Sequence, residues 1–289
     1  MAFVCLSISM YAYDFEVDGI YYDVKSLEDM TCDVVGCSSD VNELTIPATI
    51  QLNGRELKVC DIREAAFENN SALTKIIFNP GLTAEIGNNA FSGCKNLSAV
   101  NLNDVRAIGE KSFFDCPKIK KIVFPGQLQN IGSAAFALSN KDSYYGIDVS
   151  FEEGNEILHG YEPTTASDWV FYNRKIVNVH LNRDIENFGN TWTDLSNLSI
   201  GPKVSKFPSY MGNNLINVDL STTNIIEICD YAFYGYESKS ISLPLKLQKI
   251  GDRAFEFSAL TSIVLPETLQ KIGNEAFWGS DLENIVLPN

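Results

Sequence analysis

The residues of this chain that could carry out catalysis are few and poorly spaced. It contains two histidines, His159 and His180, and neither belongs to an H-E-x-x-H pair or accompanies a G-x-S-x-G turn, the patterns typical of zinc proteases and serine hydrolases. The chain has no glycine-rich phosphate loop. Carboxylates are so abundant that some pair would stand at glycosidase separation by chance. The sequence therefore does not indicate an enzyme and predicts no cofactor.

Metal binding is also poorly supported. The stretch DFEVDG from Asp14 to Gly19 resembles the start of an EF-hand loop, but its twelfth position is Lys25 instead of glutamate, so calcium coordination fails there. None of the seven cysteines form a C-x-x-C pair. We therefore predict no metal site.

Four cysteines leave their oxidation state open. Cys32 and Cys37 could form a local disulfide in an exported protein. Cys94 and Cys116 lie 22 residues apart at the same position of a repeat, which predicts that they stack on neighbouring coils. They could be a disulfide, although two small buried thiols packed side by side are also expected from this placement.

Charge and hydropathy exclude several partners. The 289 residues include 22 Lys and Arg against 37 Asp and Glu, a net charge of -15 that repels nucleic acid and anionic lipid. No apolar stretch reaches the roughly 18 residues that a transmembrane helix needs. Residues 1–13, MAFVCLSISMYAY, resemble the apolar core and exit of a signal peptide without the basic start, and a buried first strand is the alternative.

The elements that position these side chains are set by a repeat. Written from Leu260, the unit is L-x-x-I-x-L-P-x-x-L-x-x-I-G-x-x-A-F-x-x-x-x. Its Phe landmark recurs with gaps of 24, 22, 23, 97, 22 and 22 residues, and the long gap has room for worn copies. The landmarks are Phe67, Phe91, Phe113, Phe136, Phe233, Phe255 and Phe277.

Alternation within the unit predicts a short strand followed by turns. Ile263 and Leu265 fall on one face of the strand, and Pro266 ends it because proline has no amide hydrogen. A unit this short cannot bury its own apolar face, so copies must stack. The sequence predicts a mainly β repeat solenoid of about ten coils of roughly 22 residues, with irregular or 3-10 turns and the landmark phenylalanines as an internal spine.

With its L-x-x-I-x-L-P strand and I-G-x-x-A-F turn, the unit resembles the BspA-like leucine-rich repeat family. The preceding stretches YDFEVDGIYYDV and ELTIPATIQLNGRELKVCDIREAAF resemble the N-terminal β cap of its secreted bacterial members. The resemblance covers about residues 13–289. It implies a secreted or cell-surface location, a role in adhesion, and a sheet that lines the concave side of the solenoid.

Three segments follow from this organisation. We expect a β-hairpin cap at 14–58, with a tight turn at Asp18-Gly19. A leucine-rich repeat solenoid should occupy 59–289, with an insertion at about 150–173 and degenerate repeats to about 224. Cys229 replaces the usual glycine of the turn.

Two groups of residues are candidates for binding. Outward strand positions of the central coils are polar, and five of them, Asp148, His180, Ser199, Asp219 and Ser242, are expected to form one ladder. The full candidate face is Asp148, Asn178, His180, Asn197, Ser199, Asn217, Asp219, Ser240 and Ser242. The insertion adds Tyr161, Trp169 and Tyr172, because exposed aromatics anchor interfaces. A solvated sheet face and aromatics packed on the adjacent coil are the competing interpretations.

The sequence therefore favours a non-enzymatic recognition or adhesion protein. Its partner would be a host or bacterial surface protein or glycan, bound through the concave face and the aromatic insertion. A structural spacer within a larger surface protein is the alternative, and it requires no concentration of polar or aromatic residues in the central coils.

Overall fold

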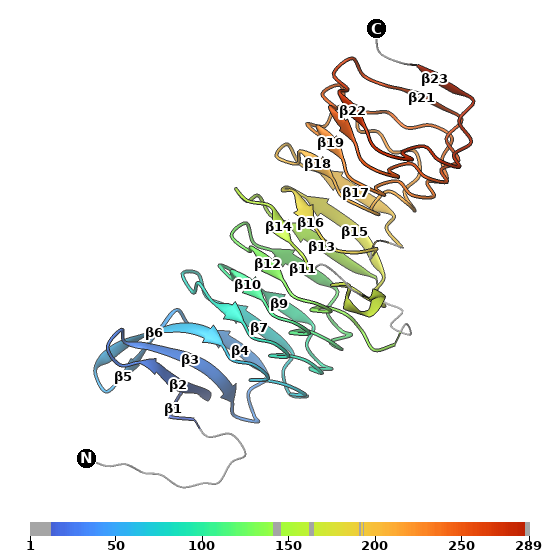
Figure 1. Cartoon of the computed structure of the whole chain (residues 1–289). Helices are drawn as coiled ribbons and strands as arrows, with labels where there is room; N and C mark the ends of the chain where they lie inside the picture. Colours follow the sequence, from blue (N-terminus) through green and yellow to red (C-terminus); the bar gives the residue numbers. More distant parts are fainter. Residues whose placement is uncertain (1–12, 141–145, 162–164, 191, 193, 287–289) are drawn as a thin grey trace.

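The chain winds into an elongated stack of coils (Figure 1). The structure, a computed structural model, describes residues 13–140, 146–161, 165–190, 192 and 194–286. The predicted repeat solenoid is confirmed. Of the predicted signal peptide, all but Tyr13 lies outside the described residues. Within the described ranges, no helix has the length and apolar character needed to cross a membrane.

The L-x-x-I-x-L stretches form parallel strands along one side of the stack, which we call the long strands, and these pair in three successive sheets. Alternation works as predicted: Ile76 and Phe78 are buried, whereas Lys75 and Ile77 face outward between them. The long strands are β4 (Glu43–Ile46), β7 (Lys75–Phe78), β9 (Ala99–Asn101), β11 (Lys121–Phe124), β13 (Ile147–Phe151), β15 (Ile176–Leu181), β17 (Asn197–Ile200), β21 (Ser262–Val264) and β23 (Asn284–Val286).

A second ladder runs along the other side of the stack and contains strands of two residues (Figure 1). These short strands precede the I-G-x-x-A-F turns and also pair in parallel from coil to coil. They are β8 (Glu85–Ile86), β10 (Ala107–Ile108), β12 (Asn130–Ile131), β14 (Leu158–His159), β16 (Ile185–Glu186), β18 (Lys206–Phe207), β19 (Glu227–Ile228), β20 (Lys249–Ile250) and β22 (Lys271–Ile272).

The N-terminal strands are partly antiparallel. They are β1 (Phe15–Val17), β2 (Ile20–Ser26), β3 (Thr31–Cys37), β5 (Thr49–Leu52) and β6 (Arg55–Ile62). The predicted hairpin joins β1 to β2 through Asp18 and Gly19, both at positive φ, as a tight two-residue turn requires. However, β4 already pairs in parallel with β7. Repeat-type pairing therefore begins at Glu43, inside the segment predicted as the cap.

The landmark phenylalanines lie on the axis of the stack. Phe67, Phe91, Phe113 and Phe136 stack with successive ring centroids 4.9, 5.2 and 4.9 Å apart. The C-terminal rings Phe233, Phe255 and Phe277 follow the same pattern at 5.1 and 5.3 Å. All of them are buried except Phe277, which is partly buried in the last coil. Burial of this spine supplies much of the apolar contact between coils.

Most of the predicted insertion at about 150–173 forms one further coil of the solenoid. The Phe136 amide donates to the carbonyl of Val170 at 2.9 Å, just as Phe113 donates to Ala135 at 2.8 Å, so Val170-Phe171 occupies the Ala-Phe position. Phe171 is buried and stacks on Phe136 at 5.7 Å. The extra residues are confined to the connection between β14 and the turn, which includes the 3-10 helix η1 (Ala166–Asp168).

All six described cysteines are free thiols, and Cys5 lies outside the described residues. The local Cys32–Cys37 bridge is wrong, because both residues lie on β3, where five strand steps span about 16 Å. Disulfides require Cα atoms about 4.4–6.8 Å apart. Cys94 and Cys116 are buried, and each thiol donates to a backbone carbonyl of the preceding coil at 3.1 Å.

Candidate binding surfaces

The outward side chains of β11, β13, β15 and β17 form two rows across the long strands. Strand register places Asp148 beside Asn178 and Asn178 beside Asn197 in the first row. The second row runs through Ser150, His180 and Ser199. We call these six residues the polar rows.

The single ladder predicted from the sequence is wrong at Asp148. That residue pairs with Lys121 of β11 and with Asn178 of β15, so it belongs to the first row, two positions away from the row of His180. The predicted register assigns Ile147 and Val149 as the last two inward residues of the strand, whereas Phe151 is also buried and extends the inward face of β13 by two residues. A shift of two residues keeps each side chain on its predicted face and changes only its neighbours.

Hydrogen bonds fix the first row. The Asn178 side-chain amide donates to the Asp148 carboxylate, and the Asn197 amide donates to the Asn178 carbonyl oxygen at 2.7 Å. The three side chains are thus held as one chain across three strands, with a carboxylate at one end. Asp148 and Asn197 remain exposed, so the outer surface of this chain is available to a partner.

The second row holds the imidazole of His180 in one tautomer. The side-chain amide nitrogen of Asn182 lies 2.7 Å from Nε2, and since an amide nitrogen can only donate, Nε2 accepts. Nδ1 therefore carries the proton and donates to the hydroxyl of Ser199. The exposed imidazole is oriented from both sides by its neighbours.

The remaining polar candidates lie on segments that do not pair with β17. Asp219 pairs with Ser242 through a parallel bridge, and Ser240 lies next to it on the same segment. Asn217 has a positive φ of 53°, which interrupts an extended strand at that position. Its segment, Leu215–Leu220, makes no strand pairing with β17, so the polar rows end there among the described residues.

The long strands also change sheet between β9 and β11, but at the boundary after β16 and β17 the pairing of both ladders stops, and we call this boundary the seam. On the short-strand side, β16 and β18 are unpaired with each other, although each continues its own sheet. In regular coils the glycine of the turn donates its amide to the coil before, as Gly109 does to Ile86 at 2.8 Å. Pro208 occupies this position at the seam and has no amide hydrogen.

A carboxylate replaces the missing backbone pairing. Asp184 Oδ1 accepts the amides of Ser205 and Lys206 at 2.7 and 2.9 Å, where most other coils use a backbone carbonyl, as the amide of Lys249 does with Ile226. Two hollows flank the seam, where the strands of neighbouring coils are unpaired. One of about 420 Å³ lies between β17 and Leu215–Leu220, and one of about 320 Å³ lies between β16 and β18.

The three aromatic candidates differ in exposure. Tyr161 is 45 % exposed. Trp169 and Tyr172 are partly buried, and the Trp169 ring lies against Gly189 of the next coil so closely that a Cβ there would stand 2.2 Å from the ring. Trp169 therefore packs between coils, and Tyr161 presents the most accessible ring of the three.

Sequence reasoning missed two buried arginines that hold the degenerate coils together. Arg174 donates to the carbonyls of Phe136, Ile119 and Cys116 at 2.6, 3.1 and 2.6 Å. Arg183 donates to several turn carbonyls, including Leu128 at 2.9 Å. Burial lowers the pKa of both guanidinium groups. The sequence contains one indication of this role: both arginines stand in degenerate repeats, at positions that point inward.

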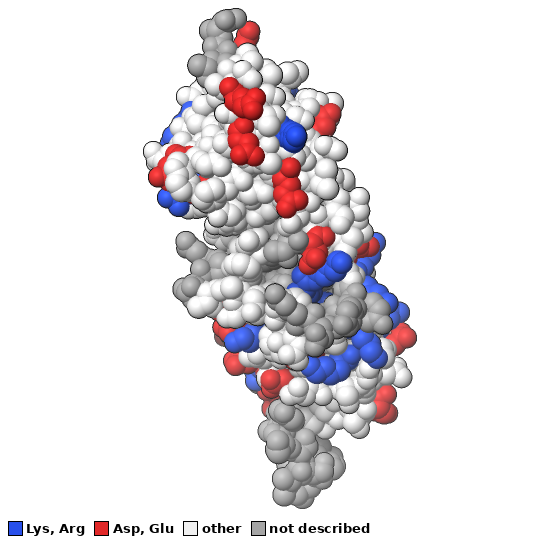
Figure 2. Space-filling view, turned by 90° about the vertical axis from the view of Figure 1, so that its right-hand side faces the viewer, with Lys and Arg blue, Asp and Glu red and all other residues white. Residues whose placement is uncertain are grey.

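The chemistry offered by these surfaces is that of hydrogen bonding. Burial raises the pKa of Cys229 to about 12, which keeps this thiol neutral and a poor nucleophile. No cluster of three or more candidate metal ligands occurs within the described part of the chain. From the long-strand side, basic side chains gather near the middle of the stack and acidic ones prevail toward the C-terminal end (Figure 2).

The comparisons with known proteins agree with this architecture. A family model described as the BspA type leucine rich repeat region matches residues 37–152 and 203–289 in six copies. No curated protein matches the chain in sequence.

Among solved structures, a leucine-rich repeat protein from Bacteroides ovatus is 24% identical with a TM-score of 0.55, over 96% of this chain and 66% of that one. A leucine-rich repeat protein of T. pallidum is 20% identical with a TM-score of 0.47, over 67% of this chain and 84% of that one. This chain thus spans slightly less than two thirds of the Bacteroides ovatus protein. The extent of the family match, together with the two ladders and the phenylalanine spine, shows that the chain belongs to the BspA-type leucine-rich repeat family.

Proposed function

We propose that this protein recognises a macromolecule, a surface protein or a glycan, through the polar rows of β13, β15 and β17. The observation that carries the proposal is the preorganisation of these rows. Asp148, Asn178 and Asn197 are hydrogen-bonded in series, and His180 is held between Asn182 and Ser199. Side chains that are already ordered lose little rotamer freedom when a partner binds.

The rows also combine groups that a polar partner needs. A carboxylate, amides, hydroxyls and an imidazole provide donors and acceptors in two adjacent rows of side chains. The strands that carry them lie about 4.8 Å apart. Tyr161 offers an exposed ring shortly after β14, and Asn217, Asp219, Ser240 and Ser242 add polar groups beyond the seam. The mechanism is surface complementarity without chemistry.

A location outside the cell or at its surface is part of this proposal. Family membership supports it, since BspA-like proteins are associated with secretion and adhesion. A spacer that only separates other domains is the alternative, and it gives no reason for the hydrogen-bonded order of the polar rows.

Binding of residues 14–289 to extracellular-matrix proteins and to bacterial and host glycans tests the proposal. The variant combines Asp148→Ala, His180→Ala and Ser199→Ala, and its matched control combines Glu85→Ala, Asn130→Ala and Lys271→Ala on the short strands. We expect the first to abolish a binding signal that the second preserves. A partner that binds both variants equally would place recognition elsewhere, and the absence of any partner would favour the spacer.

A further inference from the structure

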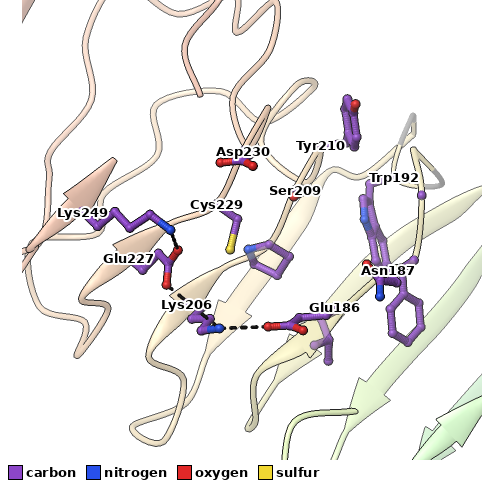
Figure 3. Close-up of a pocket in the computed structure, with 14 residues that line it drawn as sticks. Glu186, Asn187, Trp192, Lys206, Ser209, Tyr210, Glu227, Cys229, Asp230 and Lys249 are labelled. Atoms are coloured by element: carbon purple, nitrogen blue, oxygen red, sulfur yellow. Dashed lines mark hydrogen bonds and ion pairs between the residues drawn. The ribbon is translucent and has the colours of Figure 1, made fainter. Parts of the chain in front are cut away.

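We propose that the hollow on the short-strand side of the seam binds a neutral, hydroxyl-rich ring, such as one monosaccharide unit. We call it the seam pocket. It has a volume of about 320 Å³ and lies between β16 and β18, away from the polar rows (Figure 3). This volume is at the lower end of the range of small-molecule sites, about 300–1,000 Å³, so it suits a single ring.

The strongest indication is a buried donor that lacks a partner. Trp192 is 1% exposed and lines the pocket, and its Nε1 has no hydrogen-bond partner among the described residues. Figure 3 shows the indole along one wall, with its ring nitrogen on the side that faces Cys229. A buried N–H without an acceptor is unfavourable, and a bound ligand with an oxygen at this point would satisfy it.

The other walls combine apolar and polar surface. Phe188, Ile185 and Pro208 supply carbon surface on which the C–H face of a ring can pack. Ser209 adds a hydroxyl and Asn187 a side-chain amide to the lining, and both are labelled in Figure 3. A sugar ring carries both kinds of surface, whereas a purely apolar ligand would leave these polar groups and the indole N–H unpaired.

Most of the charged side chains that line the pocket are paired with one another. Lys206 lies 2.8 Å from Glu186 and 4.0 Å from Glu227, and Lys249 pairs with Glu227. The hydrogen bond with Glu186 raises the pKa of Lys206, so the lysine stays charged and engaged. Asp230 is a third carboxylate in the lining, against two lysines, and it accepts the amide of Asp252 at 2.8 Å.

An anionic ligand would therefore have to displace existing ion pairs and approach an excess carboxylate, in a protein of net charge -15. A cationic ligand would have to compete with Lys206 and Lys249 for Glu186 and Glu227. A neutral ring can instead accept from the indole N–H and from an ammonium group while it donates to a carboxylate, without separating the pairs.

Titration calorimetry with glucose, galactose, mannose and N-acetylglucosamine tests this site on the whole chain. We expect at least one of these sugars to bind with a dissociation constant of about a millimolar, as suits a few hydrogen bonds to one ring. Trp192→Phe keeps an aromatic ring and removes the N–H, and it should weaken binding about tenfold. Ser209→Tyr should fill the pocket and abolish binding.

Two controls separate this site from other surfaces. Trp278→Phe changes an exposed tryptophan of the last coil and should leave affinity unchanged. The triple variant of the polar rows should also bind the sugar normally, so this proposal and the proposed function can fail independently. The inference is overturned if no neutral sugar binds, if Trp192→Phe and Ser209→Tyr both bind like the parent, or if inorganic phosphate binds more tightly than every sugar.

Discussion

Two regions share the same repeat but differ in how their coils are joined. These are the regular coils between residues 59 and 138 and the seam between residues 184 and 230. In the regular coils every turn glycine donates to the coil before it, and Phe113 stacks on rings in both directions at 5.2 and 4.9 Å. At the seam, proline stands in place of the glycine, a carboxylate accepts two amides, and both ladders stop.

On the proposal above, the difference marks where a solenoid can acquire a binding site. In a regular repeat the backbone N–H and C=O groups are hydrogen-bonded and the core is packed, so few groups are left for a ligand to contact. Interruption of the repeat opens hollows and leaves polar groups, such as the indole N–H of Trp192, without partners. The family match stops at 152 and resumes at 203, so the sequence departs from the family pattern close to where the structure opens.

The largest expected effect is the loss of a ring from the regular spine. Phe113→Ala should lower the free energy of unfolding by about 3–5 kcal/mol, because a fully buried ring is replaced by a cavity between two stacked neighbours. Urea unfolding followed by circular dichroism measures this. Phe257→Ala, at a ring that is 47% exposed, is the matched control and should cost much less. Equal losses would show that the spine is not the principal core.

Removal of a buried arginine should come next. Arg174→Met preserves much of the side-chain volume but leaves three buried carbonyls without their donor, at a cost of about 2–3 kcal/mol. Arg106→Met, at an exposed arginine, should change the unfolding free energy by less than about 0.5 kcal/mol. If both variants unfold alike, the worn coils are held together by packing alone.

Asp184 tests the seam directly. Asp184→Ala should cost about 1–2 kcal/mol, since the amides of Ser205 and Lys206 lose their acceptor. Hydrogen exchange at these two amides should accelerate, while exchange at the Gly109 amide of a regular coil should not. Asp184→Asn retains an acceptor oxygen and should lie between the parent and the alanine variant. Unchanged exchange at Ser205 would mean that the carboxylate does not close the seam.

Much of this fold could be predicted because its physics is periodic. The Phe landmark and the alternation of the L-x-x-I-x-L stretch specify an axis and two faces, and six of the seven predicted rings are fully buried. The same reasoning located the outward polar residues, because side-chain direction depends only on alternation.

Register and the seam could not be predicted in the same way. The register of Asp148 depends on which residue of a degenerate stretch enters the core, and Gly146 to Phe151 allow two choices that differ by two positions. The seam pocket requires Asp184, Pro208 and Trp192 to act together from different turns, and none of them alone departs from ordinary loop composition. Only the three-dimensional structure shows that these residues lie close together.

The smallest expected effect comes from restoring the repeat at the seam. Pro208→Gly reinstates the glycine found in other turns, and its amide could gain a hydrogen bond of about 0.5–1.5 kcal/mol. Glycine also increases the entropy of the unfolded chain, which costs about 0.4–1 kcal/mol. The two terms nearly cancel, so the unfolding free energy should change by less than about 1 kcal/mol.

The affinity of the seam pocket should be more sensitive to this substitution than stability is. If the proline keeps the two ladders apart, closing them should shrink the pocket and weaken sugar binding, while the unfolding midpoint stays almost constant. Gly109→Ala is the contrasting change in a regular coil, where a Cβ would stand 2.8 Å from the backbone nitrogen of Asn88, and it should lower stability without affecting the pocket. If Pro208→Gly leaves affinity unchanged, the opening is held by Asp184 and the packing of Trp192, and the proline only adapts to it.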